Sequence, residues 1–159
     1  YPDALEDLRK GANVLVLRTF SKIYGLAGLR IGYGFSKKEI IEYMNRVRSP
    51  FNTNSLAQAA AEAALDDYEF VEKSRKLNEE ELKFLTEELK KRGLFVVPSV
   101  TNFVLVDFGV DSNEIYNKLL REGIITRPVK NYNLPTALRI SIGKREENLK
   151  LLSALDKVL

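Results

Sequence analysis

Short apolar runs rich in β-branched residues alternate with longer, helix-type segments along most of this chain. The apolar runs are typical of buried strands, and the amphipathic stretches between them are typical of helices. Strands separated by helices predict an α/β layered fold. The predicted strands are 13–20, 31–35, 94–98, 102–108, 124–129 and 138–143, and the predicted helices are 37–48, 56–65, 66–92, 112–122 and 144–158.

The ends of these helices carry capping signals. Ser36 with Glu39 predicts a capping box, and Asn54 or Ser55 is expected to cap the next helix. Gly93 predicts the end of the long charged helix. The glutamate run 79–81 within that helix predicts a solvated face.

The first strand, 13–20, needs neighbours if it belongs to a parallel sheet, and few residues precede it. We therefore expect its partner strands to lie upstream of Tyr1.

The composition excludes several kinds of site and partner. The 159 residues contain no cysteine and no histidine, which excludes thiol nucleophiles, Ser-His-Asp triads and histidine-bearing zinc sites within them, and we predict no metal site. The net charge is only +3, and the lysines and arginines alternate with acidic residues instead of forming a basic block. We therefore predict no nucleic-acid partner. No apolar run is long enough for a membrane span, so no membrane partner is predicted. The chain has no signal-type start and no cysteine, which favours a cytoplasmic location.

One segment, RTFSKIYGLAGLRIGY at 18–33, has the groups needed for chemistry on an anionic ligand. Hydroxyls at Thr19 and Ser21 flank Lys22, and Arg30 follows beyond a glycine-bearing loop. Hydroxyls and a guanidinium bind phosphate oxygens, and a lysine near cations loses basicity and becomes a usable nucleophile. The residues alone leave a second interpretation open, a strand that ends in a turn with Lys22 and Arg30 in solvent.

The two parts of this segment, TFSK and GLAGLRIGY, resemble the lysine signature of the class I/II aminotransferases, which are pyridoxal-phosphate enzymes of fold type I. The resemblance implies that pyridoxal 5′-phosphate forms a Schiff base with Lys22. It also implies that Thr19, Ser21 and Arg30 hold the cofactor phosphate.

Later segments resemble the histidinol-phosphate branch of that family, and they occur in the family's order. The resemblance implies amino transfer between histidinol phosphate (imidazole acetol phosphate) and glutamate or 2-oxoglutarate in histidine biosynthesis. These segments are RSPFNTN (48–54), SVTNF (99–103), GIITRP (123–128) and LRISIG (138–143).

Three later residues are candidates for binding the amino-acid and oxo-acid substrates. Arg139 is similar to the family's substrate-carboxylate arginine, and its alternative is an edge-strand arginine paired with an acid. Arg127 is a second candidate for a substrate phosphate or carboxylate. Asn102 is a third, although an asparagine between loop and strand is often a turn residue.

The resemblance also implies a domain organisation and partners. Residues 1–66 would end the large pyridoxal-phosphate domain, and 67–159 would form the small carboxy-terminal α/β domain. The family's Asp-x-x-Tyr aspartate, which pairs with the cofactor ring, is not found before Lys22. We therefore expect an N-terminal half of the same enzyme upstream, a homodimer, and little activity from these residues alone.

Two alternatives remain. The chain could belong to another class I/II aminotransferase or to a relative of threonine-phosphate decarboxylase. It could also be a non-catalytic α/β binding or assembly domain in which Lys22 is an ordinary lysine.

Overall fold

The computed structural model describes residues 3–159, and the chain separates into two compact units. The first unit runs to Lys73, and the second runs from Ser74 to Leu159. Within 3–159, no helix combines the length and the apolar character that a membrane crossing requires. The division into domains at 66/67 stays a prediction.

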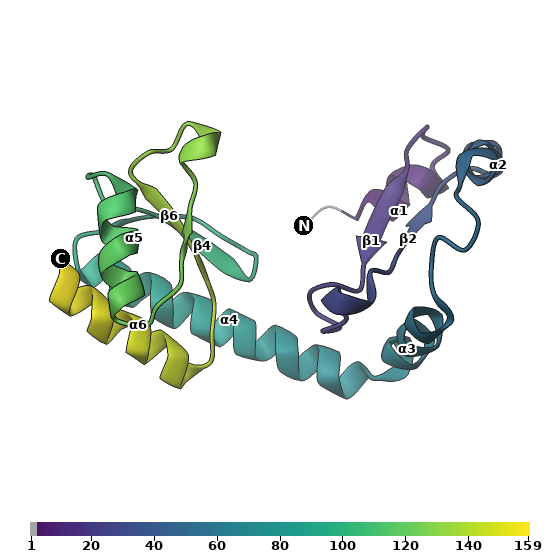
Figure 1. The fold of residues 1–159 in the computed structure, drawn as a ribbon. Helices are drawn as coiled ribbons and strands as arrows, with labels where there is room; N and C mark the ends of the chain where they lie inside the picture. The colour runs from purple at the N-terminus through teal and green to yellow at the C-terminus, as the bar shows by residue number, and fades with distance from the viewer. Residues whose placement is uncertain (1–2) are drawn as a thin grey trace. The chain divides into compact units, whose positions relative to one another are not determined.

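The first unit is built around a two-stranded antiparallel sheet (Figure 1). Its strands pair in register from Val16 opposite Phe35 to Thr19 opposite Gly32. A Cβ atom on Gly32 would lie 2.7 Å from the carbonyl oxygen of Arg18, so only glycine fits there. The elements of this unit are α1 (Ala4–Arg9), β1 (Val16–Thr19), β2 (Gly32–Phe35), α2 (Lys38–Val47) and α3 (Ser55–Asp66).

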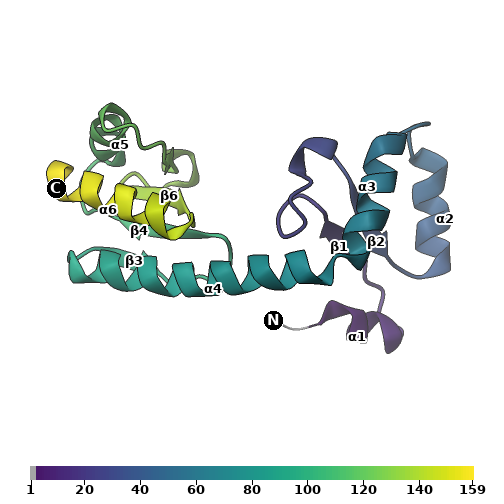
Figure 2. The same cartoon turned by 90° about the horizontal axis from the view of Figure 1, so that it is seen from below.

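The second unit is a four-stranded antiparallel sheet in the order β3-β4-β6-β5, covered by helices. Helices α4 and α6 run side by side, as Figures 1 and 2 both show. The helix α4 begins before the division between the units and continues past it. The elements are α4 (Tyr68–Lys91), β3 (Phe95–Val97), β4 (Phe103–Asp107), α5 (Ser112–Arg121), β5 (Arg127–Pro128), β6 (Ala137–Ser141) and α6 (Arg145–Val158).

The core of the second unit lies between this sheet and its helices. Side chains alternate across a strand, so Val104 and Val106 of β4 point into the core while Leu105 points to the opposite face. Leu138 and Ile140 of β6 are buried in the same cluster, which also includes Leu85, Leu89, Ile115, Leu119, Leu151, Leu152 and Leu155 from the helices.

Several expectations are confirmed. The mixture of strands and helices is an α/β fold, and each predicted helix is present within two residues of its predicted ends. Asn54 caps α3, because its Oδ1 accepts a hydrogen bond of 2.8 Å from the amide of Ala57. Gly93 follows α4 with a φ of +76°, the left-handed conformation that ends helices.

Other expectations are wrong at particular residues. Lys37, not Ser36, is the N-cap of α2, because the Ser36 hydroxyl instead donates to the carbonyl of Val14 at 2.7 Å. The predicted strand 124–129 pairs only at Arg127 and Pro128. The short helix α1 was not predicted. Every strand pairing within 3–159 is antiparallel.

The glutamate run in α4 is also not uniformly solvated. Glu79 and Glu80 are exposed, but Glu81 is only 4% exposed. A buried carboxylate is tolerated when charged and polar groups satisfy it, and Arg145 and Asn148 of α6 do so here.

Candidate functional site

The turn that carries Lys22 is fixed by an aromatic anchor just after β1. Phe20 is 3% exposed, and its ring lies 4.9 Å from that of Tyr24 and 5.3 Å from that of Tyr33. Its amide donates to the carbonyl of Ile31 at 3.2 Å, and its carbonyl accepts from the amide of Leu26 at 3.0 Å. Tyr24 and Tyr33 therefore pack against Phe20, and the anchored backbone leaves the next side chains at the surface.

The structure brings Thr19, Ser21 and Lys22 together in this turn. The Thr19 hydroxyl donates to the Ser21 hydroxyl at 2.9 Å, and the Ser21 amide donates to Thr19 Oγ1 at 3.0 Å. The side chain of Lys22 is exposed, and its carbonyl accepts from the amide of Gly25 at 2.9 Å. Two hydroxyls and a primary amine are thus available at one surface turn.

Arg30 lies on the same loop in an unusual backbone conformation. It follows the 3₁₀ turn η1 (Ala27–Leu29) with φ 56° and ψ 55°, a left-handed conformation that costs a non-glycine residue roughly 1–2 kcal/mol. Its Nη1 donates to the carbonyl of Ala27 at 2.7 Å. The other guanidinium N–H groups have no protein acceptor within residues 3–159, so they are free to bind an anion. Strain of this kind in a surface loop is typical of functional sites.

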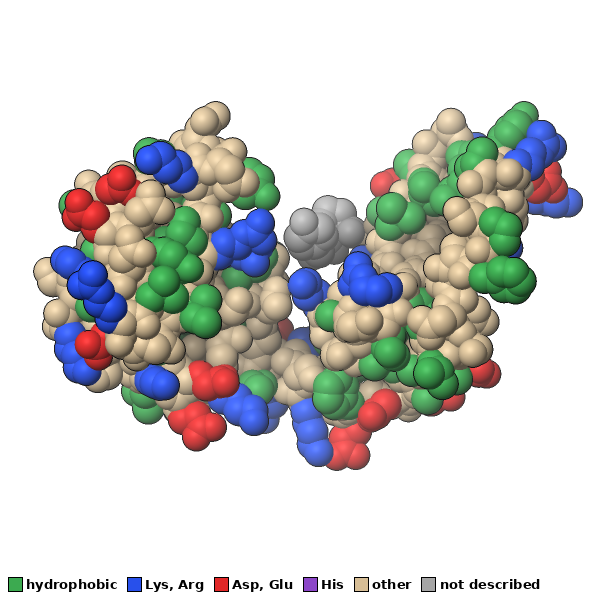
Figure 3. Space-filling view, viewed as in Figure 1, with side chains coloured by type: hydrophobic (Ala, Val, Ile, Leu, Met, Phe, Trp, Pro, Cys, Tyr) green, Lys and Arg blue, Asp and Glu red, His purple; other side chains and the backbone are tan. Residues whose placement is uncertain are grey.

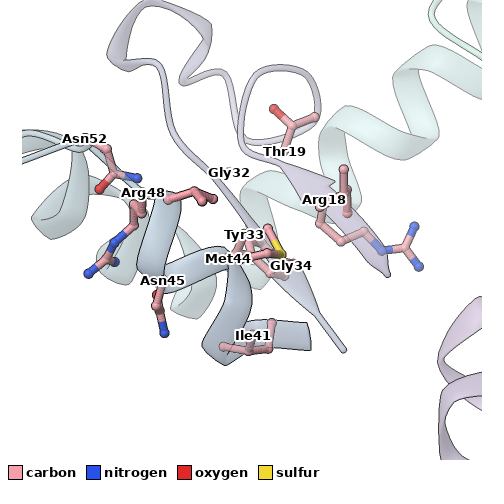
Figure 4. Close-up of a pocket in the computed structure, with 12 residues that line it drawn as sticks. Arg18, Thr19, Gly32, Tyr33, Gly34, Ile41, Met44, Asn45, Arg48 and Asn52 are labelled. Carbon is pink, nitrogen blue, oxygen red and sulfur yellow. The ribbon is translucent and has the colours of Figure 1, made fainter. Parts of the chain in front are cut away.

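A groove of about 1020 Å³ lies next to this turn, between the β1-β2 sheet and α2 (Figure 4). Ile41 and Met44 of α2 face it, and Thr19 is the only one of the four predicted cofactor residues that lines it. The groove is lined by apolar side chains together with Arg18 and Arg48 and contains no lysine, so the candidate reactive site is the Lys22 turn. The groove was not predicted, although the spacing of Ile41, Met44 and Val47 indicates one apolar helix face.

In the second unit, Arg127 and Arg139 lie directly opposite each other on β5 and β6. Both therefore occupy one face of the sheet, the face away from the core side chains Leu138 and Ile140. The Arg139 guanidinium carbon lies 5.0 Å from the centroid of the Phe103 ring. No acid within 3–159 forms an ion pair with either arginine. Because two like charges directly opposite each other repel, an anion bound between the two guanidinium groups would stabilise this arrangement.

The alternative assigned to Arg139, an edge-strand arginine paired with an acid, is wrong. β6 is an inner strand between β4 and β5, and the guanidinium lies over an aromatic ring instead of beside a carboxylate. A guanidinium over a ring face keeps its edge N–H groups available to a ligand.

Asn102 lies at the sheet end towards which Arg139 extends. It is exposed, it precedes β4, and its carbonyl accepts from the amide of Ile142 at 2.9 Å. Asn102 directly precedes Phe103, on whose ring the Arg139 guanidinium lies. The structure thus gathers the candidate substrate residues in the second unit and the candidate cofactor residues in the first, and the role of each stays a prediction.

Comparison with known proteins gives consistent matches over this whole chain. Residues 2–155 match the family described as aminotransferase class I and II. A histidinol-phosphate aminotransferase of Anaeromyxobacter sp. (strain Fw109-5) is 54% identical over 160 residues, which cover all of this chain and 44% of that protein.

Two solved structures are similar to the chain. The histidinol-phosphate aminotransferase of Sinorhizobium meliloti in complex with pyridoxal-5′-phosphate has a TM-score of 0.84 at 35% identity, covering 92% of this chain and 41% of that one. The L-threonine-O-3-phosphate decarboxylase of Porphyromonas gingivalis has a TM-score of 0.82 at 26% identity, covering 96% and 48%. The chain spans less than half the length of each of these relatives.

Proposed function

Because the chain belongs to the class I and II aminotransferase family, we propose that it is the carboxy-terminal part of a histidinol-phosphate aminotransferase of fold type I. The observation that supports this most strongly is the 54% identity to such an enzyme across the entire chain. The reaction moves an amino group between histidinol phosphate and the glutamate/2-oxoglutarate pair.

The residues of the Lys22 turn fit pyridoxal 5′-phosphate. Thr19 and Ser21 hold their hydroxyls 2.9 Å apart, and the unpaired N–H groups of Arg30 add charged donors for a phosphate. Lys22 presents an exposed amine in the same turn, which suits the cofactor's aldehyde. When bound, pyridoxal phosphate supplies the electron sink for breaking a bond at the substrate's amino-bearing carbon.

Lys22 is also the proton carrier of the proposed reaction. Lys22 would hold the cofactor through its amine, and its Nζ would then act as general base and general acid for the proton at the substrate's amino-bearing carbon. Thr19 and Ser21 are neutral hydroxyls and the Arg30 guanidinium stays protonated, so none of these three takes up the proton.

Arg139 and Arg127 orient the substrate's anionic end in this proposal. Their guanidinium groups share one sheet face, and a planar guanidinium binds carboxylate or phosphate with two parallel hydrogen bonds. Asn102, at the sheet end towards which Arg139 extends, supplies an amide to the same substrate. Both amino donors carry anionic groups, which explains how one arginine pair serves both halves of the reaction.

The complete enzyme would contain an upstream N-terminal half that supplies the remaining cofactor contacts. We also propose that it acts as a homodimer in the cytoplasm. The coverage of less than half of each relative supports the first point, and the absence of cysteine is compatible with a reducing compartment.

Reductive labelling tests the central assignment. The complete enzyme is incubated with pyridoxal phosphate, reduced with borohydride and digested, and the label is located by peptide mass. We expect the label on Lys22 and its loss in Lys22→Ala, whereas Lys38→Ala, which removes an exposed lysine of α2, keeps it. Label spread evenly over surface lysines would contradict the role of Lys22.

The match to a threonine-phosphate decarboxylase supports decarboxylation as a second candidate function. A decarboxylase breaks the bond to the carboxylate carbon and releases CO₂, whereas an aminotransferase converts 2-oxoglutarate to glutamate. Assaying the complete enzyme with histidinol phosphate and with threonine phosphate for both products separates the two.

A further inference from the structure

Glu81 is the single buried acidic side chain within residues 3–159, and both of its oxygens are bound. Its Oε1 accepts from Arg145 Nε at 2.9 Å and lies 2.9 Å from Arg145 Nη2. Its Oε2 accepts from Asn148 Nδ2 at 2.8 Å. The Arg145 guanidinium carbon also lies 3.6 Å from the centroid of the Phe84 ring. The carboxylate thus connects α4 to the first turns of α6.

Asn148 carries this connection to the backbone between β6 and α6. Its side chain is 2% exposed, its Oδ1 accepts from the amide of Gly143 at 3.1 Å, and its Nδ2 donates to the carbonyl of Gly143 at 3.1 Å. A Cβ atom on Gly143 would lie 2.9 Å from the Cβ of Glu147, so the backbone is packed closely here. The position of Gly143 therefore depends on Asn148, which Glu81 holds in place.

The same face of α4 holds the neighbouring segment before β4. Asn78 lies three residues before Glu81, and its Nδ2 donates to the carbonyl of Thr101 at 3.2 Å. The two held segments bind each other, because the Ile142 amide donates to the carbonyl of Asn102. One end of the sheet is thus fixed to α4 at two points.

This sheet end sets the surroundings of Arg139. Phe103 pairs with Ser141 at the end of the β4-β6 ladder, and its ring supports the Arg139 guanidinium. A shift of residues 142–145 relative to α4 would move Asn102 and the Phe103 ring together, and with them the position of the guanidinium.

We propose that Glu81 is a positioning residue for the substrate-binding side chains Arg139 and Asn102, acting through Asn148 and the backbone between β6 and α6. The inference rests on the proposed role of Arg139 in binding substrate. Glu81 itself touches no substrate, since it is buried between α4 and α6.

The kinetic test compares Glu81→Gln with Glu88→Gln in the complete enzyme. Glu88 lies on the same helix and also binds an arginine, Arg92, but it takes no part in the contacts of the β6–α6 connection. We expect Glu81→Gln to raise the KM for both anionic amino substrates about tenfold, the effect of weakening one charged hydrogen bond, with kcat changed less than twofold. Glu88→Gln should leave KM unchanged.

A second readout does not depend on activity. In NMR spectra of this chain, the Nε–Hε signal of Arg139, assigned by its loss in Arg139→Lys, reports the ring current of Phe103. We expect Glu81→Gln to shift this signal and Glu88→Gln to leave it in place. If Glu81→Gln does not fold, Asn78→Ala, which removes only the hydrogen bond to Thr101, should shift it in a folded protein.

The outcomes separate the two proposals. An unchanged Arg139 signal together with an unchanged KM would overturn the positioning role. A shifted signal in this chain, together with a wild-type complete enzyme that has no transaminase activity, would support the positioning role and refute the proposed function.

Discussion

At the scale of single residues, Arg30 combines a left-handed backbone with a proposed role in binding the cofactor phosphate. A side chain in this conformation is strained, and glycine would remove the strain. The neighbouring sequence contains glycines at 25, 28 and 32, so a glycine at 30 would not be out of place locally. The arginine at this position is best explained by its guanidinium.

The first prediction separates strain from binding by comparing Arg30→Gly with Arg30→Ala. Both remove the proposed phosphate donor, and we expect both to weaken pyridoxal phosphate binding to the complete enzyme about 10- to 100-fold. Only Arg30→Gly relieves the backbone, so its free energy of unfolding without cofactor should exceed that of Arg30→Ala by about 1 kcal/mol. Cofactor titration by absorbance and urea denaturation measure the two effects. Equal stabilities would argue against the left-handed backbone, and an unchanged affinity would argue against the phosphate contact.

At the scale of elements, α4 and α6 are joined by charged contacts near both ends of α6. Glu81 binds Arg145 at its start, and Arg92, just after α4, binds Asp156 near its end. The second contact is a two-point pair, with Arg92 Nε 2.6 Å from Oδ1 and Nη2 2.9 Å from Oδ2. Two helices that share only an apolar interface can slide along each other, and these contacts set their register.

The second prediction concerns the pH dependence of this contact. The hydrogen bonds from Arg92 lower the pKa of Asp156 below its usual value. A carboxylate with a depressed pKa in the folded state adds stability that is fully present above its unfolded pKa, about 3.9, and is lost as the pH falls through the folded value. The stability difference between wild type and Asp156→Asn should therefore be constant from neutral pH to about pH 5 and shrink towards zero at lower pH.

Urea denaturation across this pH range measures the difference. Glu87→Gln, on the exposed side of α4, is the matched control for the removal of a surface carboxylate. A difference between wild type and Asp156→Asn that does not change down to pH 2 would contradict the ion pair.

At the scale of the whole molecule, the two units differ in how much apolar surface they bury. The second unit has a continuous core of Leu, Val, Ile and Ala side chains from all of its helices and its three longer strands. In the first unit, the buried apolar residues are Val16, Phe20, Ala57 and Ala61. Phe51 is 99% exposed and Val47 is 84% exposed, and Figure 3 shows green hydrophobic side chains at the surface over both units. Apolar surface on this scale is typical of a region that packs against further protein.

The third prediction follows from this difference. We expect the isolated 159 residues to have little or no transaminase activity, because the first unit carries the proposed cofactor residues but has little core to hold them. Hydrogen exchange should show slower amide exchange in β4, β6 and α6 than in β1 and β2. Adding the proposed upstream half should slow exchange in β1 and β2 and restore turnover. Ordinary turnover by the 159 residues alone would refute this.

Features that depend on a few consecutive residues could be read from the sequence. The cap at Asn54, the helix end at Gly93 and the turn with Thr19, Ser21 and Lys22 each need only a local hydrogen bond or a local φ value. The family resemblance was available for the same reason, since its lysine motif is one continuous segment. The α/β class followed from periodicity, which is also a local property.

Only the tertiary structure decided how distant residues meet. Glu81 belongs to a charged helical run, and its burial depends on Arg145 and Asn148, more than sixty positions away in sequence. The alignment of Arg127 with Arg139 depends on the register of β5 with β6. Side-chain chemistry and local backbone preference depend on consecutive residues. Burial and strand register instead arise from packing between segments that come together only on folding.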